Sequence, residues 1–294
     1  MKKLADKIKR VGLIGNAGKA SCAIVVSNAA RLVRAAGRQV FSDAVTAAST
    51  GIKAMVCPNA ATLTRQVDLL LVFGGDGTML RVAREIAGTR TPMLGINIGG
   101  LGFLTAVPSN KLERALNHVW AGEFKFELRA LIEAVGKCGG YPVRQTALND
   151  IVISRGVVSR LIELDVNVDG EPLTRYRGDG LIVSSPTGST AYSLAAGGAV
   201  VFPTADVFTL TPICPHTLSN RSLILPLTST IHVKATSPKP STILSTDGQV
   251  VSELSAGDVV TIRRSRHTVR LMHLADSSFF EALRRKLHWR GAYL

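Results

Sequence analysis

A turn with three glycines and one carboxylate, Gly74-Gly75-Asp76-Gly77-Thr78, is the part of this sequence best suited to chemistry. The apolar run before it, residues 69–73, predicts a buried strand of a parallel sheet, and residues 79–87 predict a helix. Backbone N–H groups at such a helix start lack partners, the helix dipole adds partial positive charge, and glycines let the backbone take unusual dihedrals and approach a phosphate. The turn is therefore a candidate phosphate site, formed by Gly74, Gly75, Gly77 and Thr78.

Asp76 does not fit a phosphate site on its own. A carboxylate beside a phosphate is repelled unless it holds a metal ion or accepts a proton. A structural alternative is that its side chain caps the following helix through backbone N–H groups. The turn alone leaves these alternatives open, and no Walker A sequence accompanies it.

Three polar stretches in the second half lie beside apolar runs that predict strands. Asn149-Asp150 follows an apparent strand end and could form an Asx turn. Arg177-Gly178-Asp179-Gly180 could form a salt bridge within its own turn. The stretch 184–198 is rich in glycine and hydroxyl residues and carries one aromatic side chain, Tyr192. Nucleoside sites combine stacking on the base with polar contacts to its edge and ribose, so this last stretch indicates such a site.

Together these motifs resemble the NAD kinase family in its bacterial form, over nearly the whole length from about Val11. The glycine turn alone is shared with diacylglycerol and sphingoid-base kinases. The motifs of the second half, in this order and spacing, are far more specific. The resemblance is carried by residues 74–78, 97–104, 149–150, 177–183, 186–193, 211–216 and 247–249.

The resemblance implies transfer of the γ-phosphoryl group of ATP to the 2′-hydroxyl of the adenosine ribose of NAD, giving NADP, with a divalent metal, Mg or Mn. It implies that Asp76 contacts NAD and is the general base for that hydroxyl, with the alternative that Asp76 mainly holds the metal. It identifies neither the metal ligands nor a separate ATP motif. Members of the family are homodimers or homotetramers, so self-association is implied as well.

The resemblance also implies how the dinucleotide is held. Asn149 and Asp150 would hold ribose hydroxyls and the base, while Asp179, with Arg177 beside it, would bind the nicotinamide end. Two positions depart from the family pattern. Many family members have Glu at the position of Asp150 and Ser at the position of Ala195. The residues that would surround an adenine are Thr190, Ala191, Tyr192, Ser193, Leu194 and Ala195. The other NAD contacts that the resemblance implies are Gly77, Arg81, Arg160 and Gln249.

The sequence predicts two domains of different architecture, which together must position these residues. Strand and helix patterns alternate over residues 1–125, which predicts an α/β, Rossmann-like domain whose ligands lie at the carboxyl ends of parallel strands. Over residues 126–266, strand patterns separated by turn residues predict a mainly antiparallel β domain. The resemblance implies that this domain binds NAD. Residues 267–294 then complete the first domain with a returning C-terminal helix.

Three local predictions accompany this division. Residues 46–50 are small and polar and predict a loop. Residues 259–263 and 268–272 predict two separate strands. The C-terminal helix is predicted over 277–289, with Asp276 or Ser277 as its N-cap.

The composition sets limits on partners and location. The chain of 294 residues has a net charge of +14, but only 5% of its residues are aromatic, which favours phosphorylated ligands over nucleic acid. Its four cysteines form no CxxC pair, so neither a disulfide framework nor a zinc site is indicated. The sequence has no signal-peptide pattern and no apolar run of membrane-spanning length, so we expect a cytoplasmic protein that does not bind membranes.

Two other function classes share features of this sequence with a soluble dinucleotide kinase. A lipid kinase of the diacylglycerol type would share the glycine turn and use the basic surface at a membrane. It would have no need of the motif at 186–193, and no membrane-binding amphipathic helix stands out. A basic nucleotide-sensing protein without catalysis is the third class, and the intact Asp76 argues against it.

Overall fold

The computed structural model describes residues 2–100, 102–105, 107–156, 160–217, 219–237 and 242–289. The chain divides into two compact units, one made of Met1–Leu128 with Val269–Leu294 and the other of Arg129–Thr268. Strands β7 (Phe124–Cys138) and β18 (Val259–Leu274) each contribute residues to both units. The C-terminal segment therefore belongs to the first unit, as the sequence predicts.

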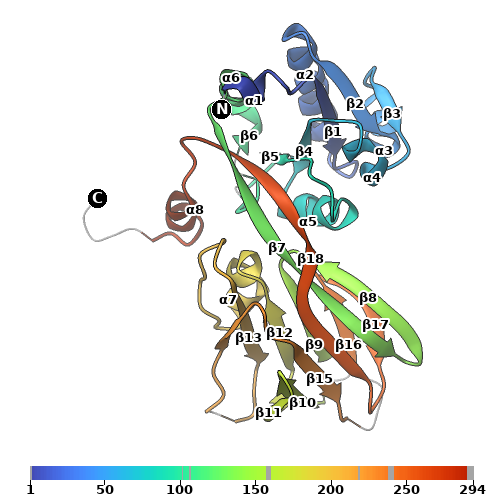
Figure 1. Cartoon of the computed structure of the whole chain (residues 1–294), viewed down its shortest axis with the longest axis vertical. Helices are drawn as coiled ribbons and strands as arrows, with labels where there is room; N and C mark the ends of the chain where they lie inside the picture. The colour runs from blue at the N-terminus through green and yellow to red at the C-terminus, as the bar shows by residue number, and fades with distance from the viewer. Residues whose placement is uncertain are drawn as a thin grey trace. The chain divides into compact units, whose positions relative to one another are not determined.

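Strand β4 (Leu69–Gly74) is central to the first unit, and all six of its residues are buried. It pairs in parallel with β1 (Arg10–Gly15) on one side and with β5 (Met93–Asn97) on the other. Gly15 is opposite Phe73, and Gly74 is opposite Asn97, so the loops after all three strands leave the sheet at one edge (Figure 1). The same sheet also contains β2 (Gln39–Asp43), β3 (Met55–Cys57) and β6 (Val107–Pro108), and the later part of β18 pairs in parallel with β5.

Helices accompany these strands because apolar side chains recur on one face of each. In α2 (Ala20–Ala35), Val26, Ala29, Ala30 and Val33 are buried at the spacing of a single helix face. Helix α5 (Asp76–Glu85) begins at the glycine turn itself. The other helices are α1 (Lys2–Ala5), α3 (Ala44–Thr50), α4 (Ala60–Thr64), the 3-10 turn η1 (Ser109–Lys111), α6 (Leu112–Ala121) and α8 (Phe279–Lys286).

Two local predictions in this unit are wrong, and capping explains both. The predicted loop at 46–50 lies inside helix α3. The carboxylate of Asp43 accepts a hydrogen bond from the N–H of Thr46 at 3.1 Å, and Gly51 ends the helix at φ +65°. In α8 the cap is Ser278, whose hydroxyl accepts from the N–H of Glu281, in place of Asp276 or Ser277.

The second unit is built mainly of antiparallel strands, as the sequence predicts, and these strands lie in two sheets (Figure 1). One sheet has the order β14-β13-β12-β9-β16-β17, and in the other β11, β10, β15 and β18 follow one another, with β7 beside β18 and β8 beside β7. Apolar side chains of both sheets, including Ile153, Val183, Phe208 and Val233, form one core. The strands not yet bounded are β8 (Tyr141–Ala147), β9 (Asp150–Arg155), β10 (Ile162–Val168), β11 (Glu171–Gly178), β12 (Gly180–Ser184), β13 (Val207–Ile213), β14 (Leu223–Pro226), β15 (Ile231–Ala235), β16 (Thr242–Thr246) and β17 (Gln249–Leu254).

Strand β18 corrects the prediction of two separate strands at 259–263 and 268–272. It is continuous over sixteen residues. Its first part pairs with β15, as in Ile262 opposite Ile231, and its later part pairs with β5, as in Leu271 opposite Met93. Different partners along one strand explain why its apolar pattern changes midway.

The burial of β4 predicts a large cost for truncating it. Phe73 is 0% exposed, so the Phe73→Ala variant should lose about 3–5 kcal/mol of unfolding free energy. Tyr141, which is 76% exposed, provides the control, because Tyr141→Ala should change that free energy by less than about 0.5 kcal/mol. Urea unfolding measures both, and a Phe73→Ala cost similar to the control would contradict the assigned core.

Candidate active site

Three loops of the first unit meet at the carboxyl end of β4. The N–H of Asn16, just after β1, donates to the carbonyl of Phe73 at 3.0 Å. The N–H of Ile98, just after β5, donates to the carbonyl of Gly74 at 2.9 Å. The glycine turn is therefore flanked on both sides by neighbouring loops, as expected for the ligand edge of a parallel sheet.

Close packing, not unusual dihedrals, explains the first glycine of the turn. A Cβ at Gly74 would lie 2.2 Å from the hydroxyl oxygen of Thr78, whereas a Cβ at Gly75 or Gly77 would meet nothing within 4 Å. None of these three glycines has a positive φ, and Gly75 is extended at φ −112°. The expectation of unusual dihedrals is wrong here, because the strand runs straight into the helix start.

The carboxylate of Asp76 is held by the loop after β5. Its Oδ1 accepts from the N–H groups of Leu104 (3.0 Å) and Thr105 (3.2 Å) and from the Thr105 hydroxyl (3.2 Å). Its Oδ2 accepts from the N–H of Phe103 at 2.8 Å. A Cβ at Gly102 would lie 1.9 Å from Oδ1, so the backbone lies directly against the carboxylate. The structural alternative for Asp76 is wrong, since these donors belong to another loop and the helix N-cap is Gly75.

The neighbouring loops bring in two side chains that the motifs did not indicate. The amide Nδ2 of Asn16 donates to the hydroxyl of Thr78 at 3.5 Å, and the ammonium of Lys19 donates to the carbonyl of Ile98 at 2.6 Å. The available signal was their position in the loop after a parallel strand, since Asn16 directly follows β1 and Lys19 directly precedes α2. The predicted residue Arg81 lies one turn into α5, where it forms an exposed ion pair with Glu85 at 2.9 Å.

In the second unit, the Asn149-Asp150 motif is joined to the stretch rich in hydroxyl residues. The N–H of Ser185 donates to the carbonyl of Asn149 at 2.8 Å, and the Ser185 hydroxyl donates to the carbonyl of Leu148 at 2.5 Å. A Cβ at Gly188 would lie 2.2 Å from the carbonyl oxygen of Asn149. Glycine at 188 is therefore required for this close approach of two predicted motifs.

A third motif reaches the same point through Asp247. Its carboxylate accepts from three successive N–H groups, those of Leu148 (3.1 Å), Asn149 (2.8 Å) and Asp150 (3.3 Å). Asp247 sits in the hairpin turn between β16 and β17 at φ +48°, a conformation that Asp tolerates better than most residues. The predicted residue Gln249 is exposed two positions later, at the start of β17.

Asp150 is buried at the start of β9, with 4% of its surface exposed. Burial, and secondly the negative charge of Asp247, raises the pKa of Asp150 to about 7. Desolvation disfavours a charged carboxylate, and a second carboxylate nearby adds repulsion. Near neutral pH this group therefore exists in both protonation states and can donate or accept a hydrogen bond.

The pair Arg177 and Asp179 does not form the salt bridge within its turn that the sequence suggested as an alternative. Asp179 instead accepts from the guanidinium of Arg155, on β9, at 2.7 Å. Arg177 lies 3.8 Å from the carboxylate of Glu163 on β10. Arg155 is a residue that the motifs missed, because only strand pairing brings it to Asp179.

The residues expected around an adenine lie on the 3-10 turn η2 (Thr187–Thr190) and the short helix α7 (Tyr192–Ala195). Tyr192 is 46% exposed, as an aromatic stacking surface requires. Ser193 is fully buried, and its hydroxyl is hydrogen-bonded to those of Thr209 (3.3 Å) and Thr211 (3.0 Å). The other residues of this group vary in exposure, since Thr190, Ala191 and Leu194 are half-buried and Ala195 is exposed. The predicted contact Arg160, which is not part of this group, is also exposed.

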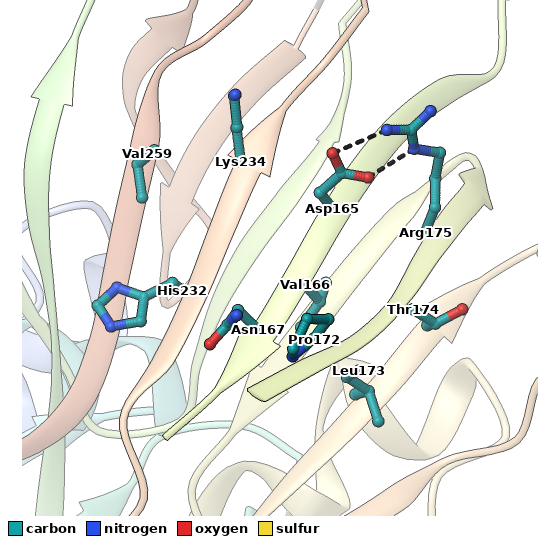
Figure 2. A pocket seen from close by; sticks show the side chains of 10 residues that line it. All are labelled: Asp165, Val166, Asn167, Pro172, Leu173, Thr174, Arg175, His232, Lys234 and Val259. Carbon is teal, nitrogen blue, oxygen red and sulfur yellow. Dashed lines mark hydrogen bonds and ion pairs between the residues drawn. The ribbon is translucent and has the colours of Figure 1, made fainter. Parts of the chain in front are cut away.

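One large hollow, of about 900 Å³, lies elsewhere on the second unit. Figure 2 shows its lining on neighbouring strands, with the ion pair between Asp165 and Arg175 across β10 and β11. His232 and Lys234 of β15 also line it. None of the predicted site residues does, so the hollow gives no support to the candidate site.

The chain is similar to known proteins over nearly its whole length. Residues 11–124 match the sequence model of the ATP-NAD kinase N-terminal domain, and residues 148–274 match that of the ATP-NAD kinase C-terminal domain. The NAD kinase of Syntrophotalea carbinolica is 39% identical over 283 residues, which cover 96% of this chain and 99% of that protein. The NAD kinase of Moorella thermoacetica is 39% identical over 97% of this chain and 91% of that protein.

Two solved structures are similar to this chain in fold. Yeast NADH kinase complexed with NADH has a TM-score of 0.88 and 27% identity, covering 98% of this chain and 89% of that one. An NAD kinase from Archaeoglobus fulgidus in complex with ATP has a TM-score of 0.75 and 24% identity, covering 96% of this chain and 100% of that one. At that identity the second likeness bears on the fold alone.

The environment of Asp150 predicts a pH-dependent stability. Because its pKa is raised from 3.8 to about 7 on folding, the folded chain binds the proton more tightly, and stability falls as the pH rises through that window. The full effect is at most roughly 4 kcal/mol. Asp150→Asn lacks the titrating group, so its unfolding free energy relative to wild type should rise from pH 4 to pH 7 in urea titrations. A difference that stays constant with pH would contradict the buried carboxyl.

Proposed function

Since the chain belongs to the NAD kinase family, we propose that it transfers the γ-phosphoryl group of ATP to the 2′-hydroxyl of the adenosine ribose of NAD, giving NADP. The observation that carries the proposal is the carboxylate of Asp76, fixed by four donors beside a glycine turn at the ligand edge of the sheet. Similarity to a yeast NADH kinase solved with NADH supports a dinucleotide acceptor.

The hydrogen bonds of Asp76 favour one oxygen as the general base. A carboxylate has about four lone-pair positions, two on each oxygen. Oδ1 already accepts from three donors, whereas Oδ2 accepts from one and keeps a position for a ribose hydroxyl. As the 2′-oxygen attacks the γ-phosphorus and the bond to ADP breaks, the hydroxyl proton would pass to Oδ2. A positioned base of this kind contributes a rate factor of roughly 10²–10⁴.

The glycine turn would bind phosphate oxygens through the first N–H groups of α5, which have no acceptor within the helix. The space beside Gly75 and Gly77 leaves this approach open, and Gly74 allows Thr78 to pack closely against the turn. Thr78 has a supporting role, because its N–H donates to the carbonyl of Gly75 at 3.0 Å and its hydroxyl accepts from Asn16. Phosphoryl transfer depends mainly on such positioning and charge stabilisation.

The second unit would hold NAD on a pre-positioned backbone. The N–H of Asn149 is bound by Asp247 and its carbonyl by Ser185, so its side chain is presented from a fixed point. Asp150, one methylene shorter than Glu, would reach a ribose hydroxyl through water. Tyr192 would stack on adenine. The remaining proposed NAD contacts are Gly77, Arg81, Arg160, Arg177, Asp179, Thr190, Ala191, Ser193, Leu194, Ala195 and Gln249.

The divalent metal implied by the family, Mg or Mn, has no preformed cage in the part of the chain that the structure describes. No group of three or more His, Cys, Asp or Glu side chains there could hold a metal ion. The described residues therefore do not form a metal site by themselves, and no step above runs through one. Mg²⁺ commonly binds chiefly to substrate phosphates, whose charge it neutralises.

The remaining proposals concern cellular location and oligomeric state. No helix in the described ranges is long and apolar enough to cross a membrane. A cytoplasmic location and a homodimer or homotetramer are proposed on the family resemblance. The lipid-kinase alternative loses support, because residues 148–274 match the ATP-NAD kinase C-terminal domain.

The base role predicts the effect of a conservative substitution. Asp76→Asn keeps the side-chain volume and removes the proton acceptor, so NADP formation from ATP, Mg²⁺ and NAD should fall to background. NAD binding, measured by calorimetry, should be nearly unchanged. Activity within tenfold of wild type would mean that Asp76 is not the base.

The contact between Gly102 and Asp76 predicts a second effect, in which no chemical group is removed. In Gly102→Ala the new Cβ would lie 1.9 Å from Oδ1 and must displace the carboxylate, so turnover should fall almost as far as in Asp76→Asn. Gly100→Ala is the matched control, because a Cβ there meets nothing within 4 Å and its φ is not positive. The test is the steady-state turnover of the two variants. Equal turnover would exclude the close contact between Gly102 and the Asp76 carboxylate.

A further inference from the structure

The loop between β1 and α2 carries a lysine that the proposed mechanism does not use. Lys19 is the last residue before α2, and its ammonium donates to the carbonyl of Ile98 at 2.6 Å. The N–H of Ile98 in turn donates to the carbonyl of Gly74. Two successive hydrogen bonds therefore tie the Lys19 charge to the phosphate-binding turn.

The loop that Lys19 contacts is also the loop that holds the proposed base. Its start, Ile98, receives the ammonium, and its later residues, Phe103 to Thr105, donate to the carboxylate of Asp76. A cation at one part of this loop and the base at another would flank a phosphoryl group that reacts beside the turn. This arrangement lies wholly within the first unit.

The site needs positive charge that the described turn does not supply. The phosphate chain of a nucleoside triphosphate carries several negative charges, whereas a helix N-terminus offers roughly half a unit charge. Arg81 of α5 forms an ion pair with Glu85 and is assigned above to NAD, not to the donor. Lys19, by contrast, is a basic side chain whose ammonium is hydrogen-bonded to the loop after β5, at the same edge of the sheet as the glycine turn.

The ammonium is also accessible to a ligand. An ammonium has three N–H donors, and the contact with Ile98 uses one of them. Lys19 is exposed, and its neighbour Gly99, at φ +132°, has no side chain. A Cβ at Gly99 would lie 3.2 Å from the Lys19 Nζ, so glycine there keeps the ammonium approachable.

We propose that Lys19 binds the phosphoanhydride chain of the phosphoryl donor, as a point charge beside the glycine turn. The inference rests on the proposed kinase function. Its chemistry is shared by ATP and by inorganic polyphosphate, so both are donors to be tested. Lys19 is assigned to donor binding and not to NAD.

The test compares Lys19→Ala and Lys19→Arg with wild type. At saturating NAD, kcat/KM for ATP should fall about 10- to 100-fold in Lys19→Ala and be partly restored in Lys19→Arg. Assays with polyphosphate distinguish the two donors, since a loss confined to one of them identifies the chain that Lys19 contacts. The NAD dissociation constant should stay within twofold, which a collapse of the Asp76 loop would not allow.

Lys53→Ala is the matched control. Lys53 is exposed and precedes β3, so it lies at the amino edge of the same parallel sheet, opposite the proposed site. Its variant should leave all of these constants unchanged. If Lys19→Ala instead keeps wild-type kcat/KM for both donors, or weakens NAD and ATP equally, the inference is overturned.

A binding measurement separates this inference from the proposed function. Inorganic tripolyphosphate, titrated into each protein by calorimetry, should bind wild type and Lys53→Ala alike and Lys19→Ala at least about tenfold more weakly. Equal binding to all three overturns the role of Lys19 even if the enzyme is active. Absence of NADP formation by wild type with either donor would refute the kinase function, whatever the tripolyphosphate result.

Discussion

The hydrogen bonding of Asp76 is the interaction on which the first unit's site depends. Its carboxylate joins the start of α5 to the loop after β5, and four donors from that loop fix its orientation. Glycine at 102 is required for the contact, and Lys19 holds the beginning of the same loop. One side chain thereby orders the loop and, in the proposed function, is the one that accepts the proton.

The second unit uses the same device. Asp247 accepts from three successive N–H groups at Asn149-Asp150, just as Asp76 accepts from three successive N–H groups at 103–105. In both cases a carboxylate accepts hydrogen bonds from backbone N–H groups of an irregular segment. Strand or helix pairing does not supply acceptors for those groups. The cost is visible at Asp150, whose pKa is raised by burial and by Asp247. The fixed backbone that we propose holds the dinucleotide thus accompanies a carboxyl group whose pKa is raised to about 7.

Much of this arrangement follows from the sequence. A buried strand ending in a glycine turn predicts a ligand site, and the parallel register aligns it with the ends of β1 and β5. The partners of the charged residues could not be predicted. Asp179 pairs with Arg155 and Arg177 lies beside Glu163 because of strand pairing over long sequence separations. Helix α3 was not predicted, because its residues are small and polar. Its caps at Asp43 and Gly51 stabilise the helix in spite of that composition.

The central claim is that Asp76 presents Oδ2 to the ribose hydroxyl of NAD. A crystal structure with NAD and a non-hydrolysable ATP analogue tests it most directly. The account predicts that Oδ2 lies about 2.6–3.2 Å from the 2′-oxygen, with Oδ1 still bound by Leu104 and Thr105. A complex in which Oδ2 lies beyond hydrogen-bonding distance of that oxygen, or binds only a metal ion, would contradict the account.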